Sequence, residues 1–337
     1  MPSLTASGGN ASLLKRWASD SIKTNNHCSN NISQNVMPIK KTHVIEYGIF
    51  RCFGFIVRLL PLHLVHKTGF ALARLAYPLL KSRREVALRN LRNAFPEMDA
   101  QRREQIALHS FQNIGATFIE LLWSQNLTKE LIKQRVCIDN YDLLERLREK
   151  KKGIVFLTAH FGSWELAIQA ISVYTDMPVC TIAKSQSNAL VDRLINRWRE
   201  LFGLKIVPMG VSVREILRTL QQGGIVALAA DQTAPKESVS VEFFGRQVPT
   251  FQGPAVFCLK TGAPIVLGCT VRQENGNYKM HLVHVPSDDL MGSSDENVFE
   301  LTQRQVRMTE EIIRHYPEQW MWMHKRWKHV PDRVGGV

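Results

Sequence analysis

Short strand-like runs that alternate with helical stretches are the feature that most limits the fold of this chain. Five runs rich in apolar and β-branched residues recur along its middle part, at residues 153–159, 178–183, 204–208, 224–230 and 264–271. Apolar residues repeat at helical spacing in 98–123, 141–153 and 188–203, and Asp99 is a plausible N-cap for the first of these helices. This order predicts an α/β layered fold in which helices flank a mostly parallel central sheet.

The first 36 residues differ from the rest of the chain in composition. They are rich in Ser, Asn, Thr and Gly and hold few apolar residues. Burial of so little apolar surface could hardly offset the entropy lost on ordering, so we expect residues 1–36 to form a disordered polar extension. No apolar run of the length found in secretory signals follows their basic residues.

Residues 37–80 are apolar and aromatic but are interrupted by charged residues such as Arg51 and Arg58 and split by Pro61. No run reaches the roughly 18 apolar residues of a membrane-spanning helix. The pattern therefore favours amphipathic helices that anchor the protein in the membrane interface, with their arginines reaching toward headgroups. A pair of amphipathic helices packed on a soluble body is the alternative.

The basic balance of the chain indicates an anionic partner. Lys and Arg outnumber Asp and Glu by 43 to 30, which gives a formal charge of +13. Nucleic acid, anionic lipid headgroups and an acidic carrier protein are the candidates. A basic cluster directly after residue 80 would add attraction to anionic lipid, although it could equally be a solvated helix face. The six cysteines form no CxxC pair, which fits buried thiols in a reducing compartment.

His160 and Glu165 are the first candidates for catalysis. They follow the strand-like run 153–159 and open a helix whose N-cap would be Ser163, and ligands gather at such strand-to-helix junctions. A zinc site is disfavoured because no second histidine lies nearby. The chain also has no GxSxG, P-loop or GxGxxG motif. A histidine and a carboxylate without a protein nucleophile predict a general base that acts on a substrate hydroxyl, with Glu165 holding the ring.

A purely structural role for these two residues is the alternative. His160 could complete the polar end of a strand, and Glu165 could favour the first turn of a helix. Neither residue decides between the two interpretations without further context.

Four motifs resemble those of the lipid A biosynthesis lauroyl/myristoyl acyltransferase family, within the lysophospholipid acyltransferase superfamily. "HFGSWE" at 160–165 is similar to its HxxxxD/E motif, and "GIVALAADQ" at 224–232 is similar to a strand that ends in Asp. The segments 241–266 and 316–328, the latter reading "YPEQWMWMHKRWK", resemble its FFG and C-terminal signatures. The motifs follow the order of the family and cover most of 37–330.

The resemblance implies the layered glycerolipid acyltransferase fold, with 37–80 as membrane-anchoring helices and 81–330 as the acyltransferase domain. It further implies a monotopic enzyme on the cytoplasmic face of the inner membrane. Such an enzyme moves a fatty acyl chain from acyl carrier protein to a hydroxyl of an anionic lipid A precursor, without cofactor or metal. A lysophospholipid, glycolipid or aminolipid acceptor stays open as the alternative.

The resemblance also implies roles for individual residues. His160 is the expected general base and Glu165 its partner. The expected substrate-binding residues come from all four motifs and the loop after 178–183: Trp164, Lys184, Asp231, Gln232, Phe244, Gly245, Lys325 and Arg326. Lys184 stands where the family usually has arginine, so it would keep a cation and lose the bidentate fork.

The C-terminal tryptophans and basic residues allow three interpretations. Trp320, Trp322 and Trp327 could pack in the core, form a membrane-interface belt, or stack on nucleic acid. Composition favours the core, and the resemblance assigns the basic residues to the acceptor headgroup. A nucleic-acid-binding protein would explain the charge, but not the apolar 44–80 stretch or the pairing of His160 with Glu165.

Overall fold

A computed structural model describes residues 40–209 and 212–332. The polar extension predicted for residues 1–36 lies outside the described residues. The described residues from Thr42 onward form one compact unit. The helices predicted as an anchor over 37–80 therefore belong largely to the same unit as the rest of the chain.

The core of this unit is a seven-stranded sheet, counted over the described residues, with the order β1-β9-β8-β2-β5-β3-β4. Neighbouring strands are parallel except β8 and β9, which are antiparallel. The strands are β1 Val136–Asp139, β2 Ile154–Thr158, β3 Val179–Ala183, β4 Lys205–Pro208, β5 Ile225–Ala229, β8 Ile265–Arg272 and β9 Tyr278–Val285. All five predicted strand runs are confirmed, as is the mostly parallel sheet.

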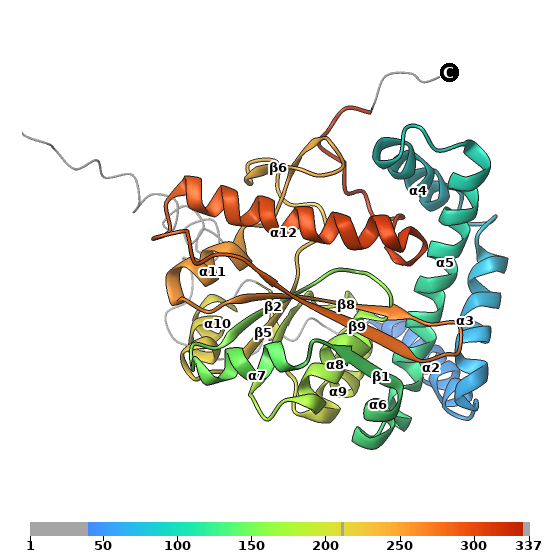
Figure 1. The fold of residues 1–337 in the computed structure, drawn as a ribbon. Helices are drawn as coiled ribbons and strands as arrows, with labels where there is room; N and C mark the ends of the chain where they lie inside the picture. Colours follow the sequence, from blue (N-terminus) through green and yellow to red (C-terminus); the bar gives the residue numbers. More distant parts are fainter. Residues whose placement is uncertain (1–39, 210–211, 333–337) are drawn as a thin grey trace, which may run out of the picture. The chain divides into compact units, whose positions relative to one another are not determined.

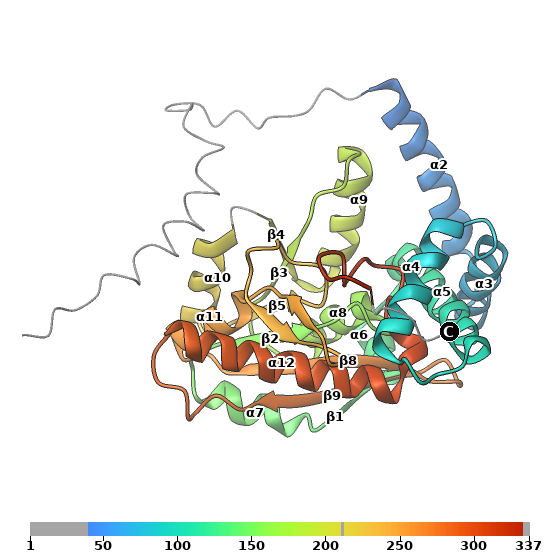
Figure 2. The same cartoon turned by 90° about the horizontal axis from the view of Figure 1, so that it is seen from above.

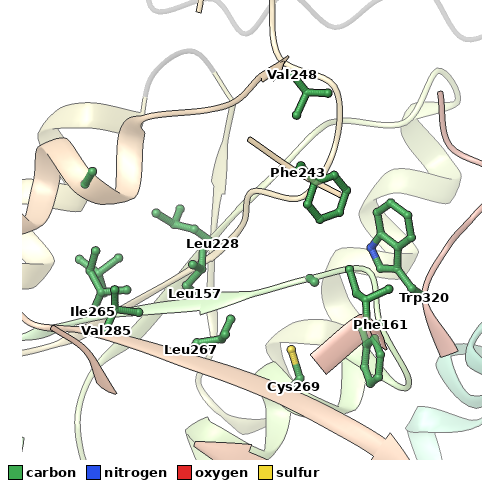
Figure 3. Close-up of a cluster of buried hydrophobic side chains, with 14 of the residues drawn as sticks. Leu157, Phe161, Leu228, Phe243, Val248, Ile265, Leu267, Cys269, Val285 and Trp320 are labelled. Atoms are coloured by element: carbon green, nitrogen blue, oxygen red, sulfur yellow. The ribbon is translucent and has the colours of Figure 1, made fainter. Parts of the chain in front are cut away.

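Helices cover both faces of this sheet, because the side chains of each strand alternate between two hydrophobic clusters. In β2, Val155 and Leu157 join one cluster, whereas Ile154 and Phe156 join the other. The first cluster includes residues of α4 Lys81–Ala94, α5 Ala100–Trp123, α10 Ser212–Gln221, α11 Gly253–Thr261 and α12 Asp295–His315. Figure 3 shows part of this cluster, with Leu157, Leu228 and Leu267 of the sheet and with Phe243 and Trp320. The second includes residues of α6 Lys129–Arg135, α7 Asp142–Glu149 and α8 Trp164–Tyr174. Figure 1 shows α12 along one face and α7 and α8 along the other.

A hairpin and a further helix complete the fold. A small antiparallel hairpin joins β6 Ser240–Glu242 to β7 Gln247–Pro249, and β6 lies against α12. The helix α9 Ala189–Arg199 follows β3 and runs into the 3₁₀ turn Glu200–Phe202. Two more 3₁₀ turns, Ser124–Asn126 and Pro317–Gln319, follow α5 and α12.

The predicted helices are present, with one boundary corrected. α5 begins after Asp99, whose side chain accepts a hydrogen bond of 2.8 Å from the Arg102 N–H, so the predicted N-cap is confirmed. The helix predicted to run to Gly153 ends at Glu149. The backbone then turns through two left-handed residues, Lys151 and Gly153, before β2 begins.

The helices α2 Lys41–Arg58 and α3 Leu62–Ala76 are separated at Pro61, as the sequence predicts. Both views place α2, α3, α4 and α5 together at one end of the sheet (Figures 1 and 2). Many large apolar side chains of the first two helices and the adjoining loops are exposed: Val44, Ile45, Ile49, Phe55, Ile56, Leu59, Leu72, Leu75, Leu79 and Leu80. Among the described helices, none is both long enough and apolar enough to span a bilayer.

α3 and α5 pack so closely that glycine is required where they meet. A Cβ on Gly69 would lie 2.4 Å from Ala116 Cα, and one on Gly115 would lie 2.6 Å from the Gly69 carbonyl oxygen. Both contacts are far inside van der Waals distance and involve backbone atoms, which cannot move aside as a flexible side chain can.

The Gly69→Ala variant should therefore lose about 1–3 kcal/mol of unfolding free energy, because the added methyl group overpacks the α3–α5 contact. Urea unfolding followed by circular dichroism measures the change. Gly48→Ala in α2 is the matched control, since a Cβ there meets nothing within 4 Å. Equal stability of the two variants would contradict the close approach.

Candidate active site

The segment between β2 and α8 is held in place by backbone contacts to two distant parts of the chain. Phe161 and Gly162 form isolated bridges with Trp320 and Thr270. Gly162 has a φ of 54°, and a Cβ at this position would lie 1.7 Å from the Thr270 carbonyl oxygen. Only glycine fits here, so the glycine of the "HFGSWE" motif serves the geometry of the turn.

Asp231 holds His160. The Nδ1 atom of His160 lies 2.8 Å from Oδ1 of Asp231, and the backbone N–H of His160 donates to Oδ2 at 2.9 Å. The indole N–H of Trp320 donates to the same Oδ2 at 2.9 Å. The carboxylate therefore fixes both the backbone and the ring of His160. The side chain of Asp231 is 5% exposed.

The other ring nitrogen of His160 faces Gln232. The Nε2 atoms of Gln232 and His160 are 3.2 Å apart. Because the ionised Asp231 can only accept, Nδ1 carries the proton in the neutral ring and Nε2 then holds the lone pair. The ring of Trp164 lies against the imidazole, with the two centroids 5.4 Å apart. Three predicted site residues, Trp164, Asp231 and Gln232, thus meet around the candidate base.

Glu165 does not hold the imidazole ring, so the predicted contact with His160 is wrong. Its carboxylate instead pairs with Arg199 at the end of α9, at 2.9 Å to Nε and 2.5 Å to Nη2. Glu165 lies in the first turn of α8, whereas the ring of His160 reaches the end of the neighbouring strand β5. Ser163 occupies the N-cap position, but its hydroxyl donates to Glu120 and caps no backbone N–H.

The charges around His160 favour its protonated form. Burial lowers the pKa of His160, but the charge and hydrogen bond of Asp231, with a smaller effect of Glu165, outweigh burial and hold the pKa above its usual range. Burial likewise raises the pKa of Asp231, and its contacts with His160 and Trp320 overcome that effect and bring it to about 2. Asp231 is therefore a carboxylate at neutral pH and stabilises an imidazolium beside it.

A pocket extends from Asp231 into the space between the sheet and α12. It is lined by the ends of β2 and β5, by the hairpin region and by α12: Leu157, Thr158, Ala230, Asp231, Phe243, Thr250, Phe251, Gln305, Val306, Thr309 and Arg326. The surface that lines it is mostly apolar, although Asp231 and Arg326 also contribute. The pocket is thus placed to take an apolar group attached to a centre that reacts near His160.

The three basic residues predicted to bind substrate differ in burial. Arg326 is 3% exposed, donates at 2.6 Å to the Pro249 carbonyl and at 2.6 Å to the Thr250 hydroxyl, and lies over the Phe243 ring. Burial lowers its pKa to about 10. The expectation that Arg326 meets a headgroup at the surface is therefore wrong, because its guanidinium lies in the core and lines the pocket.

Lys325 and Lys184 remain on the surface. The side chain of Lys325 is exposed, and its carbonyl accepts a hydrogen bond from Thr233. Lys184 directly follows β3 at the same sheet edge as His160, and its side chain is exposed. The structure thus leaves both lysines accessible to an anionic ligand.

Phe244 and Gly245 form the turn of the β6–β7 hairpin. Both have positive φ, 51° and 68°, and the Phe243 N–H donates to the Arg246 carbonyl at 2.8 Å. Phe244 is buried against Phe95 and Trp322. Phe244 and Gly245, both predicted to bind substrate, do not line the described pocket, whereas the neighbouring Phe243 does.

The C-terminal tryptophans pack in the core, as composition favours. Trp320, Trp322 and Trp327 are all buried and contact one another or the Phe243 ring. Trp320 is also a site residue through its bond to Asp231, and sequence reasoning missed that role. Its position beside the "PEQ" turn gave no local signal of this contact, because the partner lies 89 residues away.

Comparison with known proteins agrees with these observations. Residues 39–329 match the sequence profile of a family described as bacterial lipid A biosynthesis acyltransferase. The chain is 25% identical to the lipid A biosynthesis lauroyltransferase of Escherichia coli over 82% of this chain and 89% of that protein. It is 26% identical to the lipid A biosynthesis myristoyltransferase of E. coli over 75% and 78% of the two chains. It is also 24% identical to a phosphatidylinositol mannoside acyltransferase of Mycolicibacterium smegmatis over 52% and 57%.

The pairing of His160 with Asp231 predicts a distinct pH dependence. If the neutral ring is the active form, kcat/KM should rise with pH through an inflection above the usual histidine range. Asp231→Asn should move that inflection to lower pH, because it removes the charge that favours the imidazolium and leaves the effect of burial. Glu165→Gln should cause a smaller shift in the same direction.

Initial rates between about pH 5 and 9 measure this dependence. An inflection that does not move in Asp231→Asn would show that another group is titrated.

Proposed function

Because the chain belongs to the bacterial lipid A biosynthesis acyltransferase family, we propose that it transfers a fatty acyl chain from acyl carrier protein to a hydroxyl of a lipid A precursor. The observation that supports this most directly is the Asp231–His160 pair beside a pocket with a largely apolar lining. The pair supplies a base, and the pocket can accept part of an acyl chain.

In the proposed reaction His160 acts as general base without a covalent enzyme intermediate. Its Nε2 takes the proton of the acceptor hydroxyl while the hydroxyl oxygen attacks the thioester carbonyl carbon. The resulting tetrahedral species collapses, the C–S bond breaks, and the proton passes from His160 to the leaving thiolate. An ester and a free carrier thiol are formed. A thioester is already activated, so these steps invoke no metal or cofactor.

Other residues support this base by charge and contact. Asp231 stabilises the imidazolium that forms and keeps the proton on Nδ1. Glu165 stays in the proposal as a second negative charge near the ring, held in place by Arg199. Gln232 and Trp164 border Nε2 and the ring face, where the acceptor hydroxyl must approach. Lys184 and Lys325 are the proposed contacts for the phosphates of the acceptor.

A glycolipid acceptor is the second candidate, favoured by the match to the phosphatidylinositol mannoside acyltransferase. The lipid A acyltransferases match over a larger share of the chain, which supports a lipid A precursor as the first choice. The proposed base mechanism requires only a hydroxyl on the acceptor, so the same residues could serve either lipid.

The proposed location is the cytoplasmic face of the inner membrane, with the protein bound to one leaflet. The exposed apolar residues of α2 and α3, such as Ile49 and Leu75, suit the interface of a bilayer. The charge of +13 suits anionic lipid and an acidic carrier protein alike.

The central test is His160→Ala. Loss of the base should lower kcat roughly 10²- to 10⁴-fold with little change in KM, because the base acts mainly in the transition state. Asp231→Asn should lower kcat more than Glu165→Gln. Radiolabelled acyl carrier protein thioester and purified acceptors measure the rates, and mass spectrometry of the products from a lipid A precursor, a lysophospholipid and a mannosylated phosphatidylinositol identifies the acceptor.

The His284→Ala variant is the control, since His284 lies on β9 away from this sheet edge. Near-normal turnover by folded His160→Ala protein would rule out the base mechanism. A product from the lysophospholipid alone would rule out the proposed acceptor.

Membrane binding has its own test. Concentrated salt should release only part of the protein from vesicles that contain anionic lipid, because apolar burial persists when charges are screened. The double variant Ile49→Ser, Leu75→Ser should bind less in a flotation assay. Met291→Ser is the control, since Met291 is also highly exposed but lies in the loop before α12. Complete release by salt would favour helices that only pack on a soluble body.

A further inference from the structure

A buried polar network contacts residues 159–163, the segment between β2 and α8 that is called the catalytic turn below. Its centre is Glu120 on α5. Oε1 of Glu120 accepts hydrogen bonds from Arg272 at 2.7 and 3.0 Å and from the Tyr278 hydroxyl at 2.7 Å. Oε2 accepts one of 2.5 Å from the hydroxyl of Ser163, which lies in the turn itself.

The same network also holds the backbone of the turn. The guanidinium of Arg272 donates to Oδ1 of Asn113 and, at 3.1 Å, to Oγ1 of Thr117. Thr117 and Asn113 in turn donate to the Gly162 carbonyl oxygen at 2.9 and 3.3 Å. One ion pair thus reaches two adjacent residues of the turn, Gly162 and Ser163.

Burial of the charges of Arg272 and Glu120 costs free energy. A contribution to the stability of the core does not by itself explain why they are buried. The side chains of Arg272 and Glu120 are 5% and 11% exposed. Replacement of a buried ion pair by apolar residues of similar size is often neutral or stabilising, so such a pair is weak evidence for a role in stability. Burial raises the pKa of Glu120, but Arg272 and His66 outweigh that effect and bring it to about 2. The pair is therefore charged at neutral pH.

We infer that Glu120, Arg272 and Thr117 are positioning residues, which fix the Gly162–Ser163 segment and thereby the place of the His160 ring relative to the acceptor hydroxyl. This inference rests on the proposed function of His160 as general base.

The turn is held from two sides, and each side has a separate task. Asp231 orients the ring of His160 from the β5 side. The Glu120 network fixes the backbone that carries the ring from the α5 and β8 side. A displacement of about 1 Å at the reacting atoms can lower a rate about 10²-fold, so a small shift of the turn should affect turnover before it affects folding.

The network also includes the surface helix α3. His66 of α3 lies 3.0 Å from Oε1 of Glu120 and 2.7 Å from the Tyr278 hydroxyl. The carboxylate of Glu120 therefore contacts both the catalytic turn and α3, the helix that exposes Leu72 and Leu75.

Thr117→Val gives the sharpest test, because valine keeps the shape of threonine and removes the bond to Gly162. We expect kcat to fall roughly 10- to 100-fold with KM little changed. Thr117→Ser restores the hydroxyl and should return kcat to within about 3-fold of the original value.

The matched control is Thr302→Val on α12. Thr302 is also a fully buried threonine, and its hydroxyl lies 2.6 Å from the carbonyl oxygen of Val298, four residues earlier, as the Thr117 hydroxyl lies 3.0 Å from that of Asn113. This hydrogen bond of Thr302 stays within α12. Rates are compared per folded molecule, with thermal melting recorded for each variant.

Glu120→Gln adds a second variant, with Glu104→Gln as its control on the same helix. Glu104 is paired with Arg84 at 2.6 Å and Tyr77 at 3.0 Å, away from the turn. We expect kcat to fall in Glu120→Gln and to stay unchanged in Glu104→Gln. Equal kcat per folded molecule in Thr117→Val and Thr302→Val would overturn the inference, as would a rate loss in Thr117→Val that Thr117→Ser does not restore.

The outcome for His160→Ala separates this inference from the proposed function. If His160→Ala is inactive while Thr117→Val and Glu120→Gln turn over normally, the positioning role is wrong and the base mechanism stands. If folded His160→Ala is active, the proposed function itself is wrong.

Discussion

The parallel pairing of β2 with β5 is the interaction on which the site depends. Thr158 lies opposite Ala229 in this register, and His160 and Asp231 each follow two residues later. The two strands end at the same edge of the sheet, so their next polar side chains meet at 2.8 Å although they are 71 residues apart in the chain. A slip of one residue in this register would turn one strand's side chains to the other face and separate the pair.

The buried charges of this protein are concentrated around that edge. Asp231 is compensated by His160 and Trp320, and Glu120 is compensated by Arg272. Arg326 differs, because its guanidinium donates to the neutral oxygens of Pro249 and Thr250. A buried guanidinium with neutral partners favours any negative charge that forms nearby, and Arg326 lines the same pocket as Asp231. The electrostatics of the site therefore come from several strands and loops at once.

The surface helices and the catalytic turn are parts of one packed structure. α3 lies against α5 through Gly69 and Gly115, and α5 provides Asn113, Thr117 and Glu120 to the turn. Helix α5 therefore has an exposed apolar helix on one side and the site on the other. Under the function proposed above, this packing keeps the proposed base at a fixed distance from the helices that would bind the membrane.

The sequence by itself determined features that depend on neighbouring residues: the five strand runs, the Asp99 cap, the break at Pro61 and the position of His160 at a strand end. It did not reveal β1, a four-residue strand, or β9, whose apolar residues alternate with polar ones beside an antiparallel partner. Tertiary structure alone decided that Asp231 holds His160, that Glu165 pairs with Arg199, and that Arg326 is buried while Lys325 is exposed. The physical reason is that helix and strand periods fix the relations of residues a few positions apart, whereas the order and register of strands in the sheet determine which distant side chains meet.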